Sequence, residues 1–279
     1  MHFSPAPAFT SWPCPLEDTR IDDALAAAAY EATPAKHRAA LKSGLALSHM
    51  YFGQSPGHTQ ATRRDTHLGF WQQEAREPAH WALVVFGPAY AAAARLAAAC
   101  MPALLAGVPL LGAVCAGGPP RPETLVSLEL CGVEDVFAAD MPLLETTLRA
   151  CPAREGRLVL LHEGELSALA GLARELHLPC FEEYRAPRLL LRDAAAFDTA
   201  ALAFAHGSAP EPVSTAPHDG APPPDALYAA AALPDCPASL LLTPGCEGFW
   251  LHLGLTPEFF TLTRRCFGPL PSAPCDLMR

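Results

Sequence analysis

Hydrophobic positions in residues 81–150 alternate between short continuous runs and longer segments rich in small residues. Short apolar runs that end at Gly or Pro predict buried strands, and the segments between them have the length and period of helices. Strands that alternate with helices are typical of right-handed βαβ units around a largely parallel sheet, which places ligand sites at the carboxyl ends of its strands. The predicted elements are strands at 81–86, 110–115 and 132–137 and helices through 106 and at 123–130.

The pattern continues on both sides of this region. Before it, the chain predicts helices at 22–30 and 34–51, followed by a polar connector without a clear period at 53–77. Segment 208–224 is rich in proline and predicts a flexible loop. The remaining predicted elements are strands at 157–162, 188–192 and 239–242 and helices at 165–176, 197–206 and 257–266.

Composition restricts the class of protein. The chain has 279 residues, of which 51% are hydrophobic and 17% charged, and these values predict a globular protein. Its net charge of −10 supplies no basic stripe for a phosphate backbone, so we expect no nucleic-acid partner. The apolar run 89–114 contains Arg95, prolines and glycines, which predicts helix plus strand in a buried core and no membrane span. The first residues lack the pattern of a secretory signal, so we expect a cytoplasmic location.

The ten cysteines include no Cys-x-x-Cys pair and show no regular spacing. We therefore expect reduced thiols that act as small hydrophobic residues.

The order of four glycine-containing segments resembles that of a known family. These segments are 82–108, 132–137, 188–207 and 242–260, and together they resemble histidinol dehydrogenases, which share their fold with aldehyde dehydrogenases. The resemblance implies an α/β fold with two Rossmann-like αβα lobes and an N-terminal helical arm. It implies a helical arm and connector at 1–77, a nucleotide-binding-like lobe at 78–180, and a second lobe at 181–279 with its flexible loop at 208–224. It also implies a homodimer with intertwined arms, a role that the helical segment 20–51 suits.

The resemblance implies a cleft for NAD, but the family's cofactor-contacting residues are replaced here. The cleft lies near Gly87, and the family's tyrosine, glutamine and asparagine fall on Ala92, Leu143 and Glu165. A carboxylate at Glu165 would repel a dinucleotide pyrophosphate, where an asparagine could donate a hydrogen bond. We therefore expect the cleft to persist without a resident cofactor, and NAD is kept as the alternative.

The zinc site and the general base implied by the family are also incomplete. One of the family's zinc ligands falls on His206, while its paired glutamine is Ala203, and a single histidine cannot hold zinc. We expect no metal, and His206 has the alternative role of capping the carboxyl end of a helix. The family's Glu-His pair falls on Asp225 and Ala226, which leaves a carboxylate without its imidazole. Asp225 has the alternative role of capping the amino end of a helix at 227–232.

Two further groups are candidates for chemistry. Cys246 lies in a glycine-flanked turn, where a thiolate nucleophile would need a cationic neighbour, and Glu247 acts against this. The sequence His162-Glu163-Gly164-Glu165 follows a strand and predicts either an acid–base or metal cluster or ordinary acidic residues at a helix start. The segment 248–252, with Phe249, Trp250 and His252, predicts a pocket lining or a packed β-edge.

Two functions fit these observations. The first is a histidinol-dehydrogenase-like protein that has lost zinc-dependent chemistry and acts as a ligand-binding, regulatory or assembly protein, with a small molecule as its ligand. The alternative is an NAD(P)-dependent oxidoreductase that acts on an alcohol or aldehyde through a site rebuilt around Cys246, His162, Glu165 and His206.

Overall fold

A five-stranded parallel sheet forms the centre of the larger lobe. The structure, a computed structural model, describes residues 9–53, 57–213, 223–231, 236 and 238–270. The strand order is β5-β4-β3-β6-β7, so the strand predicted at 81–86 lies in the middle of the sheet. The strands are β3 (Trp81–Phe86), β4 (Leu110–Ala116), β5 (Asp135–Ala139), β6 (Gly156–Leu161) and β7 (Cys180–Glu183).

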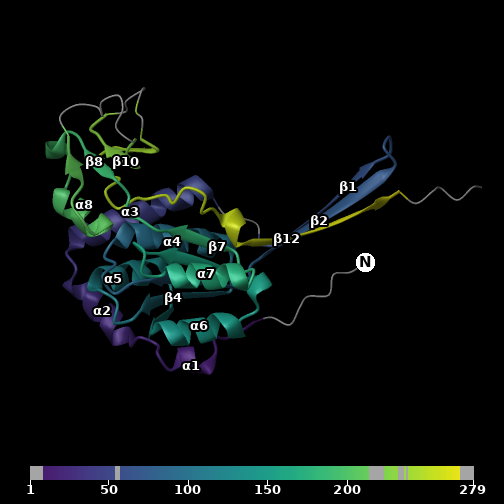
Figure 1. Ribbon diagram of the computed structural model, residues 1–279. Helices are drawn as coiled ribbons and strands as arrows, with labels where there is room; N and C mark the ends of the chain where they lie inside the picture. The colour runs from purple at the N-terminus through teal and green to yellow at the C-terminus, as the bar shows by residue number, and fades with distance from the viewer. Residues whose placement is uncertain (1–8, 54–56, 214–222, 232–235, 237, 271–279) are drawn as a thin grey trace, which may run out of the picture.

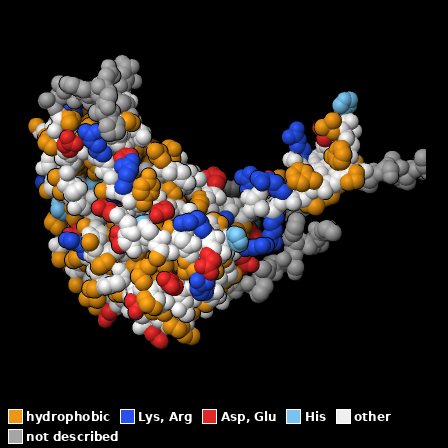
Figure 2. Space-filling model, viewed as in Figure 1, with side chains coloured by type: hydrophobic (Ala, Val, Ile, Leu, Met, Phe, Trp, Pro, Cys, Tyr) orange, Lys and Arg blue, Asp and Glu red, His pale blue; other side chains and the backbone are white. Residues whose placement is uncertain are grey.

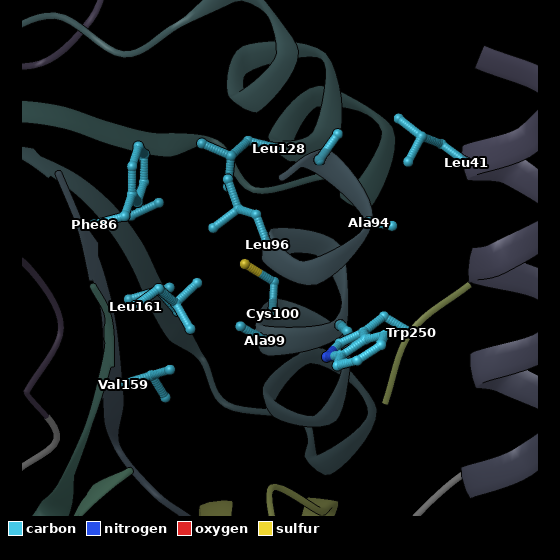
Figure 3. Close-up of a cluster of buried hydrophobic side chains, with 14 of the residues drawn as sticks. Leu41, Phe86, Ala94, Leu96, Ala99, Cys100, Leu128, Val159, Leu161 and Trp250 are labelled. Atoms are coloured by element: carbon cyan, nitrogen blue, oxygen red, sulfur yellow. The ribbon is translucent and has the colours of Figure 1, made fainter. Parts of the chain in front are cut away.

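Helices cover both faces of this sheet, which explains the continuous apolar runs of its strands. Alternate strand residues belong to different cores: Val84 and Phe86 pack with α4 and α5, whereas Leu83 and Val85 pack with α1, α6 and α7. Figure 3 shows Leu96 and Cys100 of α4 directed toward the sheet and Trp250 on the other side of the same helix. The helices are α1 (Cys14–Glu17), α4 (Ala93–Ala106), α5 (Pro122–Cys131), α6 (Met141–Ala150) and α7 (Ser167–Glu175), with a 3₁₀ turn η1 (Ala153–Glu155).

The N-terminal helices α2 (Asp23–Ala32) and α3 (Ala35–Phe52) pack against their own chain. Helix α2 contacts α5, and α3 contacts α4 and α8. The approach is closest at Gly44, where a Cβ atom would lie 1.9 Å from the carbonyl oxygen of Gly248. Helix α3 therefore supports the segment around Gly248.

A second lobe contains a smaller parallel sheet with the strand order β11-β10-β8-β9. It lies on the α4 side of the larger lobe (Figure 1), and α8 packs between the two lobes against α3 and α4. Its elements are β8 (Leu189–Leu191), η2 (Ala194–Ala196), α8 (Thr199–His206), β9 (Glu211–Pro212), β10 (Ala226–Tyr228) and β11 (Leu240–Leu242). The chain is thus an α/β protein with two parallel-sheet lobes, as predicted.

A three-stranded antiparallel sheet, which we call the β-arm, projects from the body (Figure 1). Its strands are β1 (Thr59–Asp65), β2 (Phe70–Pro78) and β12 (Thr261–Pro269), and the 3₁₀ turn η3 (Pro257–Phe260) precedes β12. Strand β2 is central, and it pairs with β1 and β12 along their whole lengths. The predicted connector at 53–77 is therefore wrong, because residues 59–78 form a hairpin.

Two other predictions are also wrong. Segment 257–266 is a short 3₁₀ turn and a strand, because its residues pair with β2 far away in the sequence. Residues 227–231 of the predicted helix at 227–232 are not helical, because Ala226–Tyr228 is the strand β10 between β8 and β11. The predicted loop at 208–224 falls largely outside the described residues; its described beginning contains β9. In the described part of the chain, no helix combines the length and apolarity needed to cross a bilayer, and run 89–114 divides into α4 and β4.

Candidate functional site

A cleft of about 500 Å³ lies between the two lobes, at the carboxyl ends of β3, β6 and β7. Open parallel sheets bind their ligands at this edge. The turn after β3 and the start of α4 supply one wall, and the segments after β6 and β7 supply another. The end of α8 closes the cleft from the second lobe. The lining residues that carry polar side chains are Tyr90, Arg95, His162, Glu163, Glu165, Glu183, Arg185, His206 and Ser208.

A buried group of charged side chains forms the floor of this cleft. Arg95 in the first turn of α4 donates from Nη1 to Oε1 of Glu183 at 3.0 Å. The other carboxylate oxygen, Oε2, lies 3.1 Å from Nδ1 of His252. Burial raises the pKa of Glu183, but the hydrogen bond and charge of His252 and the charge of Arg95 outweigh burial and hold the pKa below its ordinary value. Glu183 is therefore a carboxylate inside the protein.

His252 has an acceptor at each of its ring nitrogens. Nδ1 faces the Glu183 carboxylate, and Nε2 lies 2.7 Å from the backbone carbonyl oxygen of Arg95. The floor of the cleft thus holds the Arg95 guanidinium beside the Glu183 carboxylate, with the His252 ring packed between Glu183 and the backbone of Arg95.

His206 ends α8 on the opposite side of the cleft and is 2% exposed. Its Nε2 is 2.5 Å from the hydroxyl of Tyr228, and the imidazole also interacts with the backbone of Glu247. Burial, and next the positive charge of Arg95, lower the pKa of His206 to about 3. The imidazole is therefore neutral at pH 7, which excludes the predicted role of a charged cap at the helix end.

The segment after β6 adds polar groups at the mouth of the cleft. Nδ1 of His162 accepts from the backbone N–H of Gly164 at 2.9 Å, so Nε2 carries the proton and donates to Glu182 at 3.0 Å. Helix α7 begins only at Ser167, so Glu163 and Glu165 precede the helix. Because both ring nitrogens of His162 are engaged, it has no free nitrogen for a metal or for proton transfer.

The structure brings three of the four predicted cofactor-contacting positions together. Ala92 lines the cleft, and Glu165 lies against Gly87, where a Cβ atom would be 2.8 Å from its Oε1. Leu143 does not reach this cleft, because α6 follows the edge strand β5 and packs on the other face of the sheet. A Cβ atom at Gly207, which has φ +78°, would lie 3.2 Å from the backbone nitrogen of Ala92, so a glycine here allows the two lobes to approach closely.

The other candidate residues lie outside the lining of this cleft. Asp225 accepts two hydrogen bonds from Arg185, at 2.8 and 2.9 Å, and one from the backbone N–H of Arg188. The bond to Arg185 is the main cause of its lowered pKa, so Asp225 acts as an ion-pair partner at the start of a strand and does not cap a helix. Cys246 is half-buried, packs at the edge of the main core and does not line the cleft.

A second cavity of about 230 Å³ adjoins the cleft at Glu183 and Arg185. Trp250 and His252 line it, as the pocket interpretation of segment 248–252 predicts, and no strand forms there. Arg95, Glu183 and Tyr228 were not among the predicted site residues. Arg95 had one signal in the sequence, since it is the only charged residue in the apolar run 89–114.

The side chains at the cleft do not fit the zinc that the fold family implies. In the described part of the chain, no group of three or more His, Cys, Asp or Glu side chains is arranged to hold a metal ion. His206 contacts Tyr228, and the nearby Arg95 guanidinium opposes a cation. Zinc needs three or four donors at fixed geometry, and the described side chains around His206 do not form such a group.

Comparisons with known proteins support the fold. No family model and no curated protein sequence matches this chain. Among solved structures, histidinol dehydrogenase from Elizabethkingia anophelis matches 91% of this chain and 77% of its own length, with a TM-score of 0.56 and 12% identity. Succinate-semialdehyde dehydrogenase from Burkholderia pseudomallei matches 60% of this chain and 34% of its own length, with a TM-score of 0.37 and 15% identity. An aldehyde dehydrogenase from Brucella melitensis biovar abortus 2308 matches 64% of this chain and 46% of its own length, with a TM-score of 0.33 and 16% identity.

At 12% identity, the likeness to the first structure concerns the fold alone. The chain has the α/β fold of that dehydrogenase, with two Rossmann-like lobes, and fold does not determine activity. Any function therefore has to be argued from the side chains of the cleft.

Proposed function

We propose that this chain is a dehydrogenase-fold protein that binds a small molecule in the cleft between its lobes and has lost zinc-dependent dehydrogenase chemistry. The surroundings of His206 carry this proposal. His206 is the one position at which a family zinc ligand is kept, and it lies between Tyr228, Trp250 and the charge of Arg95. None of these neighbours offers a carboxylate, imidazole or thiolate to complete a metal site.

The surroundings of Gly87 support the loss of dinucleotide binding. In sheets of this type, the turn after the first strand approaches the pyrophosphate closely, and backbone N–H groups hold it. Here the Glu165 carboxylate occupies the space beside Gly87, and Glu163 lies in the same segment. Two carboxylates at this position repel a pyrophosphate.

Calorimetric titration and elemental analysis test this proposal. We expect no saturable NAD or NADH binding by the full chain at micromolar concentrations and no stoichiometric zinc after purification without chelators. Because the Glu165 carboxylate is the proposed obstacle, Glu165→Asn is expected to raise any residual NAD affinity, whereas Glu145→Asn on the surface of α6 is expected to leave it unchanged.

Three outcomes would support the oxidoreductase alternative instead. These are saturable NAD binding by the natural chain, stoichiometric zinc, or alcohol or aldehyde oxidation that is lost in Cys246→Ala. Stoichiometric zinc in particular would show that our ligand count at His206 is wrong.

We also propose that the chain forms a homodimer, in which the β-arm is the contacting segment. The helical segment 20–51 packs on its own lobes, whereas the β-arm projects from the body and carries hydrophobic side chains on its surface (Figure 2). Among these, Leu68, Phe70 and Phe267 are exposed. The β-arm carries five arginines and three acidic residues, although the whole chain has a net charge of −10. A basic projecting sheet on an acidic protein is complementary in charge to the body of a second copy.

Light scattering tests the dimer with two matched variants. Phe267→Asp is expected to give a monomer, because it places a charge in the proposed apolar contact. Met50→Asp changes an equally exposed apolar residue on α3 and is expected to leave the dimer intact. A natural chain that stays monomeric at high concentration would exclude the homodimer, and a monomer produced only by Met50→Asp would assign the contact to the helical segment.

A further inference from the structure

The β-arm has no core of its own, so its direction has to be set where it joins the body. In the strands β1, β2 and β12 every residue is exposed or half-exposed, and these strands contact mainly one another. Packing against the lobes therefore does not hold the arm in place. The contacts that can hold it lie at its base, where Thr261 of β12 pairs with Pro78 of β2.

The segment between β2 and β3 is bonded to the start of β6 on the larger lobe. The backbone N–H of His80 donates to the carbonyl oxygen of Glu155 at 2.8 Å, and Nδ1 of His80 lies 2.8 Å from Oε2 of the same residue. The backbone N–H of Ala79 donates to the carbonyl oxygen of Phe260 at 2.7 Å, so the segments that lead into β2 and β12 are also bonded to each other. The base of the arm is thus attached to the lobe at residues 155–157.

Arg157, the second residue of β6, provides the bonds to the start of β12. Its Nε donates to the carbonyl oxygen of Phe259, and its Nη2 donates to that of Thr261 at 2.8 Å. Its Nη1 donates to the carbonyl oxygen of Gly156 at 2.7 Å. The planar fork of a guanidinium suits several acceptors held at fixed positions, which the single ammonium of a lysine does not. Arg157 therefore connects a strand of the larger lobe to the first residues of β12.

The burial of Arg157 costs free energy that no ion pair offsets. The residue is 7% exposed, and its partners among the described residues are backbone carbonyls and no carboxylate. Burial lowers the pKa of Arg157, and no neighbouring negative charge opposes this shift. An apolar side chain of similar volume is often tolerated in place of such a buried charge. A contribution to overall stability therefore does not explain why a guanidinium occupies this position, whereas its fixed hydrogen-bond geometry does.

We propose that Arg157 is a positioning residue that fixes the direction of the β-arm relative to the larger lobe and thereby presents the exposed hydrophobic side chains of the arm to a second copy. A rigid arm loses less conformational freedom on docking than a hinged arm, so it binds its partner more tightly. The second half of this inference rests on the proposed homodimer, and the first half does not.

Hydrogen–deuterium exchange of the full chain, measured by mass spectrometry, tests this inference with three variants. Arg157→Met keeps the length of the side chain and removes its charge and donors, whereas Arg157→Lys keeps the charge and loses the fork. Arg154→Met, at an exposed position of η1, is the matched control. The amides of residues 79–80 and 260–263 report on the base of the arm, and those of the buried strand β4 are the reference. Light scattering over a range of concentrations gives the dimer dissociation constant of each chain.

In Arg157→Met we expect exchange at the base of the arm to be faster by about tenfold or more, as for the loss of hydrogen bonds from a charged group, and exchange in β4 to stay unchanged. The dimer dissociation constant should rise by about tenfold or more in the same variant, because its arm samples many directions. Arg157→Lys should change both quantities in the same direction by a smaller factor, and Arg154→Met by less than about twofold. If Arg157→Met does not fold, Arg157→Lys decides.

Equal exchange at the base of the arm in Arg157→Met and in the natural chain would overturn the inference. An equal rise at the base and in β4 would also overturn it, because it would show a general loss of stability. Faster exchange at the base with an unchanged dimer dissociation constant would overturn the role of Arg157 in presenting the arm. A natural chain that is monomeric would exclude the proposed homodimer, and the exchange rates would still decide whether Arg157 fixes the arm.

Discussion

Replacing Glu183 by alanine is expected to lower the free energy of unfolding by about 3 to 5 kcal/mol. Among the described residues, Glu183 is the carboxylate that contacts both Arg95 and His252; these two residues are buried, and the Glu183 side chain is 13% exposed. Its removal leaves the buried Arg95 guanidinium without its partner charge in a region that water screens poorly. Urea denaturation at pH 7, followed by circular dichroism, measures the change in midpoint and slope.

Two further variants separate charge from packing. Glu183→Gln keeps the volume and one acceptor oxygen, so it should lose part of the stability that Glu183→Ala loses. Glu175→Ala removes the carboxylate of an exposed ion pair with Arg149 and should change stability far less. If Glu183→Ala were as stable as Glu175→Ala, the three buried side chains would not form the charged group described here.

The larger sheet could be predicted from the sequence because its strands are buried on both faces. Strand β3 lies at the predicted residues 81–86, and all six of its residues are fully buried. Gly107 and Gly132 end α4 and α5 in the left-handed conformation, so these boundaries also have a local cause. A strand that is buried on both faces consists of a continuous run of apolar residues. Such a run can be recognised in the sequence without knowing which strands pair with it.

The β-arm could not be predicted in the same way. Its strands are exposed or half-exposed on both faces, so neither face imposes an alternation of apolar and polar residues. Strand β12 owes its conformation to pairing with β2, whose residues lie more than 180 positions earlier, as in the pair Thr263 and Arg76. The predicted role of Asp225 as a helix cap is wrong for a related reason, since β10 has only three residues and its conformation depends on its neighbours β8 and β11.

The charged side chains at the floor of the cleft could not be predicted from the sequence either. Its members come from the start of α4, the end of β7 and a segment without regular structure near the carboxyl end of the chain. No spacing motif connects residues 95, 183 and 252. The resemblance to histidinol dehydrogenases predicted the position of the cleft through Gly87 and Glu165. The loss of the family's residues did not indicate which side chains form the floor of the cleft.

Acid is expected to destabilise this protein through His206 before its carboxylates become protonated. Burial, and next the charge of Arg95, lower the pKa of His206 from 6.5 to about 3 in the folded chain. Between these two values the unfolded chain binds a proton that the folded chain does not, so stability falls as the pH falls. The loss begins near pH 6.5 and reaches about 2 to 3 kcal/mol at pH 4.5. Glu183 and Asp225, whose pKa values are lowered in the folded chain, lose their contribution only at more acidic pH.

Urea denaturation at intervals from pH 7 to pH 4.5 measures this slope in the natural chain and in His206→Gln. Glutamine keeps a polar partner for Tyr228 and cannot titrate, so the variant should start less stable but lose less stability on acidification. Other titrating groups, including His252, are present in both chains and cancel in the difference. His67→Gln, in the exposed turn of the β-arm, should keep the slope of the natural chain. Parallel curves for the natural chain and His206→Gln would show that His206 accepts a proton in the folded state.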